Sequence, residues 1–341
     1  MKVMVTGGAG YVGGTVSALL VQQGHQVVVV DNLCHARRDQ VPAGVDFVEA
    51  DIADRAVIEG LFRRAADENA SFDGVLHFAA LIEAGESMKY PEVYFRNNTA
   101  STLALLEAVL AAGPKRIVFS STAAVYGEPE TVPIPETAAL RPTNTYGESK
   151  LLVEYMLGWF HKIHGLRSAS LRYFNVAGAP EAGGYGSGIV NSGEAHEPES
   201  HLIPLILDVA LGHRAAIKIF GEDYPTHDGT CVRDYIHVSD LADAHLLALQ
   251  ALETPRAADH RLIYNLGNGA GFTVKEVIDS VRRVTGHPIP VEVNPRRPGD
   301  PAFLIASSAK AIAELDWKPK YTQIDEIIRT AWIWHQKRHA K

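Results

Sequence analysis

Short apolar runs alternate with helix-like segments over the first half of the chain. The runs are rich in valine and aromatic residues and are apolar at successive positions, as expected for strands that are buried on both faces of a sheet. They lie at residues 2–7, 26–31, 45–51, 74–80, 115–121 and 168–175. Between them, helices are predicted near 11–23, 55–67 and 92–112 and after residue 146. Strands separated by helices in this way predict a doubly wound parallel sheet.

The pattern changes after residue 175. Residues 178–188 read GAPEAGGYGSG, a glycine-rich loop that we expect to lie over a site. Helices are predicted near 202–212, 238–252, 274–285 and 324–338. We therefore expect a first domain at 1–175, to which a segment near 236–260 returns, and a smaller C-terminal α/β lobe formed mainly by 176–341.

Composition narrows the class of protein. The chain has 341 residues, of which 46% are hydrophobic and 21% charged, as in ordinary globular proteins. Its net charge of −8 argues against nucleic acid as a partner. No apolar run approaches the ~20 residues that span a bilayer, and the N-terminus leads into a predicted strand instead of a signal peptide. Two cysteines, Cys34 and Cys231, are too few for a disulfide framework, so we expect a reduced, cytoplasmic protein with no membrane partner.

A glycine-rich turn follows the first predicted strand. The stretch VTGGAGYVGG at 5–14 fits G-x-x-G-x-x-G through Gly7, Gly10 and Gly13, and it fits G-x-G-x-x-G if Gly8 replaces Gly7. Glycines let the backbone turn tightly and approach a pyrophosphate, which then lies at the N-terminus of the next helix. The motif in this context predicts a dinucleotide-binding domain of the Rossmann type.

Acidic residues end the second and third predicted strands. Asp31 follows Gly13 by 18 residues, where a carboxylate accepts hydrogen bonds from a ribose diol and repels a 2′-phosphate. This favours NAD over NADP, although Arg37 and Arg38 lie nearby and leave the choice partly open. Asp51 is a candidate for the adenine amino group, with a helix N-cap as the alternative.

A tyrosine and a lysine lie one helical turn apart in TYGESK, residues 145–150. The spacing brings Lys150 beside Tyr146, where its charge favours the phenolate and prepares the phenol to exchange a proton with a substrate hydroxyl. The spacing by itself also occurs by chance. It gains weight from the upstream dinucleotide motif and from FSSTAAVYG at 119–127, whose Thr122 is positioned to bond the same substrate oxygen.

These residues resemble a known family. TGGAGYVG, Thr122 and YGESK are similar to the extended short-chain dehydrogenase/reductases. Downstream segments at 77–87, 172–179, 219–245 and 294–300 resemble the UDP-glucose 4-epimerase family within that group. The likeness covers nearly the whole chain, and its most specific part is DYPTHDGTCVRDYIHVSDLADAH.

The resemblance implies an enzyme, an isomerase of galactose metabolism that interconverts UDP-galactose and UDP-glucose with a retained NAD. Tyr146 would deprotonate the sugar 4-hydroxyl while a hydride passes from C4 to NAD. The transient 4-keto sugar would rotate and take the hydride back on its other face. Thr122 would share the hydroxyl, and Lys150 would tune the tyrosine and bind the nicotinamide ribose.

The resemblance also implies further site residues. It extends the cofactor site to Tyr11, Val12, Asn32, Ile52, Phe78, Ala79, Ala80, Asn98 and Phe174. It assigns the UDP-sugar to Thr122, Asn175, His201, Leu202, Phe220, Arg233, Tyr235, Arg297 and Asp300. The planar guanidinium groups of Arg233 and Arg297 suit diphosphate oxygens, although each arginine taken singly also fits a surface charge.

Three positions depart from the family pattern: Ile82, His201 and Leu304. They leave the choice of sugar open, because a residue smaller than tyrosine at position 304 makes room for a 2-acetamido sugar. Nucleotide-sugar dehydratases and decarboxylases also have the Tyr–Lys pair, but the related dehydratases have acids directly after the hydroxyl residue. Here Ala123 and Ala124 follow Thr122, which favours epimerisation. A non-catalytic NAD-sensing regulator is the remaining alternative, and the intact Tyr–Lys pair argues against it.

The remaining reactive residues are interpreted as structural. His77 is expected to be a hydrogen-bonded core histidine, and neither cysteine belongs to a nucleophilic grouping. We expect no metal, because among the fifteen histidines we find no H-x-x-x-H or similar pair on a helix with a carboxylate partner. By analogy with the family, helices near 92–112 and 146–163 are expected to pack against their copies in a homodimer.

Overall fold

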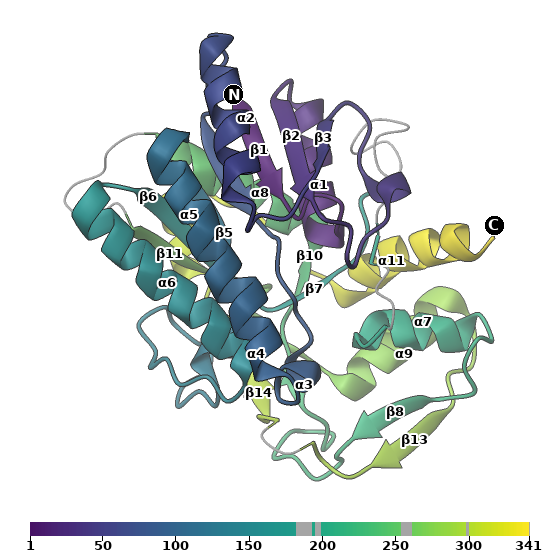
Figure 1. The fold of residues 1–341 in the computed structure, drawn as a ribbon. Coiled ribbons are helices and arrows are strands. Elements are labelled where there is room, and N and C mark those ends of the chain that lie inside the picture. Colours follow the sequence, from purple (N-terminus) through teal and green to yellow (C-terminus); the bar gives the residue numbers. More distant parts are fainter. Residues whose placement is uncertain (182–192, 195–198, 254–260, 298–299, 341) are drawn as a thin grey trace.

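Seven parallel strands form the central sheet, in the order β11-β6-β5-β4-β1-β2-β3 (Figure 1). The computed structural model describes residues 1–181, 193–194, 199–253, 261–297 and 300–340. The sheet strands are β1 Lys2–Thr6, β2 Gln26–Asp31, β3 Asp46–Glu49, β4 Gly74–His77, β5 Arg116–Ser120, β6 Arg167–Tyr173 and β11 Arg261–Leu266. The predicted Rossmann-type sheet is confirmed.

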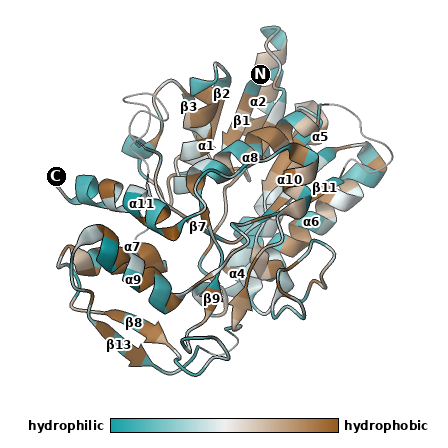
Figure 2. Cartoon of the chain, turned by 180° about the vertical axis from the view of Figure 1, so that it is seen from behind, coloured by the Kyte–Doolittle hydropathy of each residue, from teal (hydrophilic) through white to brown (hydrophobic). Residues whose placement is uncertain are grey.

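Helices cover both faces of this sheet. The helices of the first face are α1 Tyr11–Gln22, α8 Val238–Ala251 and α10 Ala309–Leu315, and those of the second are α2 Arg55–Asp67, α5 Ser101–Ala112 and α6 Thr145–His164. Figure 1 is seen from the side of α5 and α6, and Figure 2 shows α8 and α10 on the opposite side. Strand β2 explains the continuous valine run. Val27 and Val29 pack with the first set of helices, whereas Val28 and Val30 pack with the second.

Three segments from the second half of the chain join this part of the molecule. Helix α8 packs against α1, β11 pairs with β6 at the edge of the sheet, and α10 packs against α8 and β11. The sequence pattern did not indicate β11. Its six residues, RLIYNL, mix polar and apolar positions, and their strand conformation depends on pairing with a distant partner.

The long helix predicted near 92–112 is divided into three parts. Helix α4 spans Pro91–Tyr94, a π-helical turn spans Phe95–Ala100, and α5 follows. Asn98 lies in the π-helical turn and is buried. Its side-chain amide bonds the backbone N–H and carbonyl of Leu81 and the hydroxyl of Ser149. Such turns are frequent at functional sites, and this one brings a predicted cofactor residue inward.

The second lobe has its own apolar core. It is formed mainly by α7 Leu202–Ala210, α9 Val274–Thr285 and α11 Ile324–His339. Its small sheets pair β8 Ile217–Phe220 with β13 Val291–Asn294, β7 Asn175–Ala177 with β10 Tyr235–His237, and β9 Val232–Arg233 with both β12 Phe272–Thr273 and β14 Phe303–Leu304. Short helical segments lie at α3 Ala84–Ser87, Arg38–Gln40 and Ala123–Tyr126.

Most of the predicted glycine-rich loop, residues 182–188, lies outside the described residues, as does 254–260 of the segment expected to return to the first domain. Within the described part of the chain, no helix is long and apolar enough to cross a membrane.

Candidate active site

The glycine-rich turn lies where the strand order reverses. Strand β1 has β2 on one side and β4 on the other, so the loop after β1 opens at the switch point of the sheet. Gly7 has a φ of +73°, and a Cβ on it would lie 2.5 Å from the backbone nitrogen of Ala79. A Cβ on Gly13 would collide with the carbonyl oxygen of Gly7. Helix α1 begins after Gly10 without a side-chain cap, so its first N–H groups suit an anion. These features fit the pyrophosphate of a dinucleotide.

Asp31 is fixed at the carboxyl end of β2. Its two carboxylate oxygens accept hydrogen bonds from the backbone N–H groups of Ala9, at 3.0 Å, and Leu33, at 2.9 Å. Arg37 forms an ion pair with Asp39, and the guanidinium of Arg38 lies 3.8 Å from the Phe47 ring centroid. Both arginines are therefore engaged with other side chains, which supports a ribose diol at Asp31.

Asp51 does not cap helix α2, since Asp54 is the N-cap residue. Its carboxylate instead accepts hydrogen bonds from the side chain of Asn32, at 3.0 Å, and from the N–H of Ala53, at 2.8 Å. The structure thus excludes the N-cap alternative for Asp51 and leaves the adenine contact as a prediction.

The other predicted cofactor residues lie on four separate segments. Phe78, Ala79 and Ala80 follow β4, and the backbone of this segment contacts Gly7. Tyr11 and Val12 begin α1, and the Tyr11 hydroxyl donates to the carbonyl of Gly178 at 2.5 Å. Ile52 is buried beneath the β3–α2 connection, and Phe174 is buried between β6 and β7 with Leu151.

The N-terminus of α6 presents Tyr146 to Thr122. Asn144 caps this helix by accepting from the N–H of Gly147 at 2.8 Å. A Cβ on Gly147 would lie 2.6 Å from the carbonyl oxygen of Ala124, so glycine allows the helix to approach the turn that begins at Thr122. The Thr122 side chain lies close enough to the Tyr146 phenol to lower the pKa of that phenol. The two hydroxyls predicted to share a substrate oxygen therefore lie side by side.

Lys150 points from the same helix to the end of β5. It is 2% exposed, its ammonium donates to the carbonyl of Ser120 at 2.9 Å, and it lies 6.0 Å from the Tyr146 ring centroid. Burial lowers the pKa of Lys150 to about 7. Burial also raises the pKa of the Tyr146 phenol, the neighbouring Thr122 side chain lowers it, and the charge of Glu83 raises it. That Lys150 lowers the pKa of Tyr146 stays a prediction.

Sequence reasoning missed two polar residues around this pair. Ser120 accepts from Lys150 through its carbonyl and bonds the Tyr173 hydroxyl through its own hydroxyl. Glu83 accepts from the Ser200 hydroxyl at 2.7 Å and raises the pKa of Tyr146. Ser120 stands in the quoted FSSTAAVYG stretch, so its position at a strand end was the available signal.

His201 precedes α7, and Leu202 is the first residue of that helix. The His201 Nδ1 atom lies 3.0 Å from carboxylate oxygens of both Glu194 and Glu199. Burial lowers the pKa of His201, but Glu194, Glu199 and Glu83 together raise it to about 9. The residue that departs from the family pattern therefore lies among carboxylates that favour its protonated form, while burial raises the pKa of its partner Glu194.

The residues predicted for the UDP-sugar gather on the small sheets of the second lobe. Arg233 on β9 pairs with Asp300, and Arg297 lies 4.0 Å from the ring centroid of Phe220 at the end of β8. Asn175 on β7 is the register partner of Tyr235 on β10 and donates to the carbonyl of Asp234 at 3.0 Å. The structure thus brings Arg233 to Asp300, Arg297 to Phe220 and Asn175 to Tyr235.

A buried carboxylate that the sequence did not single out organises this region. Asp234, between Arg233 and Tyr235, is fully buried and accepts from the backbone N–H groups of Asn268, Gly269 and Ala306. It joins β9 to two distant loops. No local pattern distinguishes it from the neighbouring charged residues.

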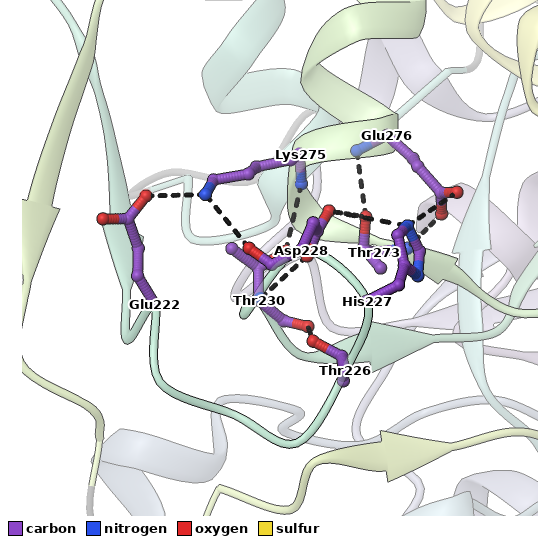
Figure 3. Close-up of polar contacts among 8 residues, drawn as sticks. All are labelled: Glu222, Thr226, His227, Asp228, Thr230, Thr273, Lys275 and Glu276. Carbon is purple, nitrogen blue, oxygen red and sulfur yellow. Dashed lines mark hydrogen bonds and ion pairs between the residues drawn. The ribbon is translucent and has the colours of Figure 1, made fainter.

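The loop before β9 is fixed to the start of α9 (Figure 3). The Asp228 carboxylate accepts from the N–H and hydroxyl of Thr230, both at 2.8 Å, and from the Thr273 hydroxyl at 2.6 Å. Lys275 bonds the Asp228 carbonyl and pairs with Glu222 across the loop. These bonds hold the segment that leads to Arg233.

The expectation that His77 is a hydrogen-bonded core histidine is confirmed. His77 is buried between the hydroxyls of Thr6, at 2.7 Å, and Thr102, at 2.8 Å, and burial lowers its pKa to about 3. Cys34 and Cys231 are free thiols.

Comparison with known proteins agrees with this geometry. The description "NAD dependent epimerase/dehydratase family" matches residues 3–267. A UDP-glucose 4-epimerase of Streptomyces lividans is 53% identical over 340 residues, which cover 100% of this chain and 97% of that protein. A UDP-glucose 4-epimerase structure from Stenotrophomonas maltophila, with bound NAD and formylated UDP-arabinopyranose, has a TM-score of 0.91 at 41% identity and covers 100% of this chain and 99% of its own. One from Bifidobacterium longum, with NAD+ and UDP, has a TM-score of 0.88 at 35% identity, with coverage of 100% and 99%. The chain belongs to the NAD dependent epimerase/dehydratase family.

Proposed function

We propose that this protein is an NAD-dependent 4-epimerase that interconverts UDP-galactose and UDP-glucose. The observation that carries the proposal is the grouping of Tyr146, Thr122 and Lys150 beside the end of β5, with the threonine side chain next to the phenol. A relative that is 53% identical over the whole chain is named for this activity. The glycine turn and Asp31 support a bound NAD.

The three side chains have separate tasks in this reaction. Tyr146 accepts the proton of the sugar 4-hydroxyl and returns it, while Thr122 holds the same oxygen by a hydrogen bond. Lys150 stabilises the phenolate by its charge and bonds the nicotinamide ribose. When bound, NAD supplies a hydride acceptor and donor for the sugar C4.

The turn after Thr122 favours reversal over elimination. Ala123 and Ala124 offer neither an acid nor a base beside the transient 4-keto sugar. A dehydratase needs such groups to remove water from the sugar. The proton on Tyr146 therefore returns to the 4-oxygen, and the net result is inversion at C4.

One part of the chain binds the cofactor and the other binds the sugar nucleotide. Residues 1–175, with the later segment that includes α8, bind NAD, and residues 176–341 mainly bind the UDP-sugar. Arg233 and Arg297 hold the diphosphate, because their guanidinium groups match its oxygens. Because Arg233 pairs with Asp300, its guanidinium is held in place as a hydrogen-bond donor for the diphosphate.

A 2-acetamido sugar is a second candidate substrate. Leu304 is the register partner of Arg233 on the neighbouring strand, so the two side chains share a face of the small sheet. Leucine is shorter than the tyrosine of the family pattern and leaves room for an acetamido group. A parallel NMR sample with UDP-N-acetylgalactosamine tests this candidate, and formation of UDP-N-acetylglucosamine would establish it as a substrate.

The protein is further proposed to act as a cytoplasmic homodimer. Tyr155, Trp159 and Ile163 follow one another at intervals of four along α6 and are 50%, 62% and 64% exposed. Leu103 on the adjacent α5 is also exposed. A continuous apolar stripe of this kind supports packing against a second copy. Sedimentation that gives only monomers would contradict it.

The experiment is proton NMR of the purified protein with UDP-galactose and no added cofactor. We expect UDP-glucose to accumulate to a fixed equilibrium ratio, which would also establish that NAD is retained. Matched samples contain Tyr146→Phe, which removes the proton-transfer group, and Tyr155→Phe, which removes an exposed phenol from the same helix. Turnover that survives Tyr146→Phe unchanged would exclude this assignment of the base.

A further inference from the structure

A cluster of histidines around one aspartate lies between α7 and α11, away from the residues assigned to catalysis. His335 and His339 are four residues apart on α11, which places both imidazoles on one face of the helix. Asp208 comes from α7, and His213 follows in the turn after that helix. The two helices pack against each other (Figure 1).

The ligand atoms of this cluster point toward one another. The Asp208 Oδ1 atom lies 2.8 Å from His335 Nε2, 3.8 Å from His213 Nδ1 and 3.9 Å from His339 Nε2. The ligand atoms of Asp208, His213 and His339 all lie within 4.8 Å of one another. A tetrahedral zinc ion with Zn–N and Zn–O bonds of ~2.0–2.1 Å separates its ligands by about 3.4 Å. The two distances to Asp208 Oδ1 exceed this value by about half an ångström, and the imidazole nitrogens of His213 and His339 would have to approach by at most about 1.4 Å.

We propose that Asp208, His213 and His339 form a zinc-binding site that fastens the C-terminal helix α11 to α7, with His335 orienting the carboxylate. The ligand set of two imidazoles and one carboxylate suits a divalent ion of borderline softness. His335 is buried and bonds Asp208, the kind of outer contact that holds a metal-binding carboxylate in place. Water would complete the coordination at the exposed side of His213 and His339.

Charged groups around the cluster both favour and oppose the binding of a cation. The Asp208 carboxylate attracts a cation, and its Oδ1 atom faces the three imidazoles. Arg214 lies 3.6 Å from the second oxygen of Asp208 and repels a cation. We therefore expect weaker binding than in a buried site of four protein ligands.

The sequence analysis missed this site for two reasons. The H-x-x-x-H spacing of His335 and His339 stands in the sequence at the end of the helix predicted near 324–338, and it was overlooked. The carboxylate partner lies 127 residues away from His335 in the chain, so only the tertiary structure brings it there.

The test is isothermal titration of Zn²⁺ into the tag-free, full-length protein after treatment with EDTA. We expect one zinc ion per chain, and we expect His213→Ala and His339→Ala each to weaken binding by at least about tenfold. His164→Ala, which removes an exposed histidine at the end of α6, should leave the affinity unchanged. Circular dichroism of each variant verifies that it is folded.

A second arm separates this cluster from another group of possible ligands. Glu194, Glu199 and His201 also place their ligand atoms within 4.8 Å of one another. Loss of zinc binding in His201→Ala, with His339→Ala unaffected, would assign the ion to that group and overturn the proposal. Absence of binding to the unmodified protein would overturn it as well.

Discussion

Removal of one charge from the buried ion pair between Glu154 and Arg172 should cause a large loss of stability. Glu154 lies one turn after Lys150 on α6. Its carboxylate accepts a hydrogen bond from the Arg172 Nε atom at 2.9 Å and another from a terminal guanidinium nitrogen at 2.6 Å. The Ser121 hydroxyl donates to it at 2.5 Å. The side chains are 4% and 2% exposed, so water cannot replace the carboxylate. We propose Glu154→Gln as the perturbation, because it keeps the shape and removes the charge.

The magnitude follows from the burial of both partners. Glutamine leaves the Arg172 charge uncompensated in the interior, and breaking a buried pair in this way costs ~3–5 kcal/mol. If the 341 residues unfold cooperatively, the entropy of unfolding is about 0.7 kcal/mol/K, so Tm should fall by roughly 4–7 °C. Replacing both residues with methionine should recover part of this loss, since no charge is then left unpaired.

Thermal and chemical denaturation of Glu154→Gln measure the effect directly. Glu107→Gln is the matched control, because Glu107 pairs with Arg55 in a bridge whose side chains are both about half exposed. Its stability should change by less than ~1 kcal/mol. Equal changes in the two variants would refute the argument from burial. A fall below about 1 °C in Glu154→Gln would do the same.

Three further predictions concern the site. Gly13→Ala should abolish NAD retention, measured by absorbance after denaturation, because its Cβ collides with the Gly7 carbonyl, whereas Gly60→Ala, where a Cβ meets nothing within 4 Å, should retain NAD. Burial lowers the pKa of Lys150 to about 7 in the folded protein, so the unfolded chain binds more protons than the folded one at pH 7–9. This residue should therefore make the cofactor-free protein more stable as the pH rises from 7 to 9, by up to ~2 kcal/mol. Lys150→Met should lack that contribution in urea denaturation at pH 7 and pH 9, and equal pH slopes in both proteins would contradict it. Trp159→Lys should yield monomers by sedimentation with its fold intact, and a persistent dimer would remove α6 from the interface.

The Tyr–Lys pair was predictable because its geometry is local. A separation of four residues in a helix fixes the relation of Lys150 to Tyr146 whatever the rest of the chain does. The glycine turn was predictable for the same reason, since the clash at Gly13 involves a carbonyl only six residues away. Interactions with Ser120 and Glu83 depend on strand order and could not be deduced from their spacing.

The sequence by itself determined the alternation of strands and helices, the glycine turn and the Tyr–Lys spacing, because each depends on residues within one or two neighbouring elements. Only the tertiary structure decided that β11 completes the sheet, that Asn98 turns inward from a π-helical turn, and that Asp208 meets the histidines of α11. These features depend on contacts between segments far apart in the chain. A periodic pattern records which face of a segment is buried, but it does not record which distant segment buries it.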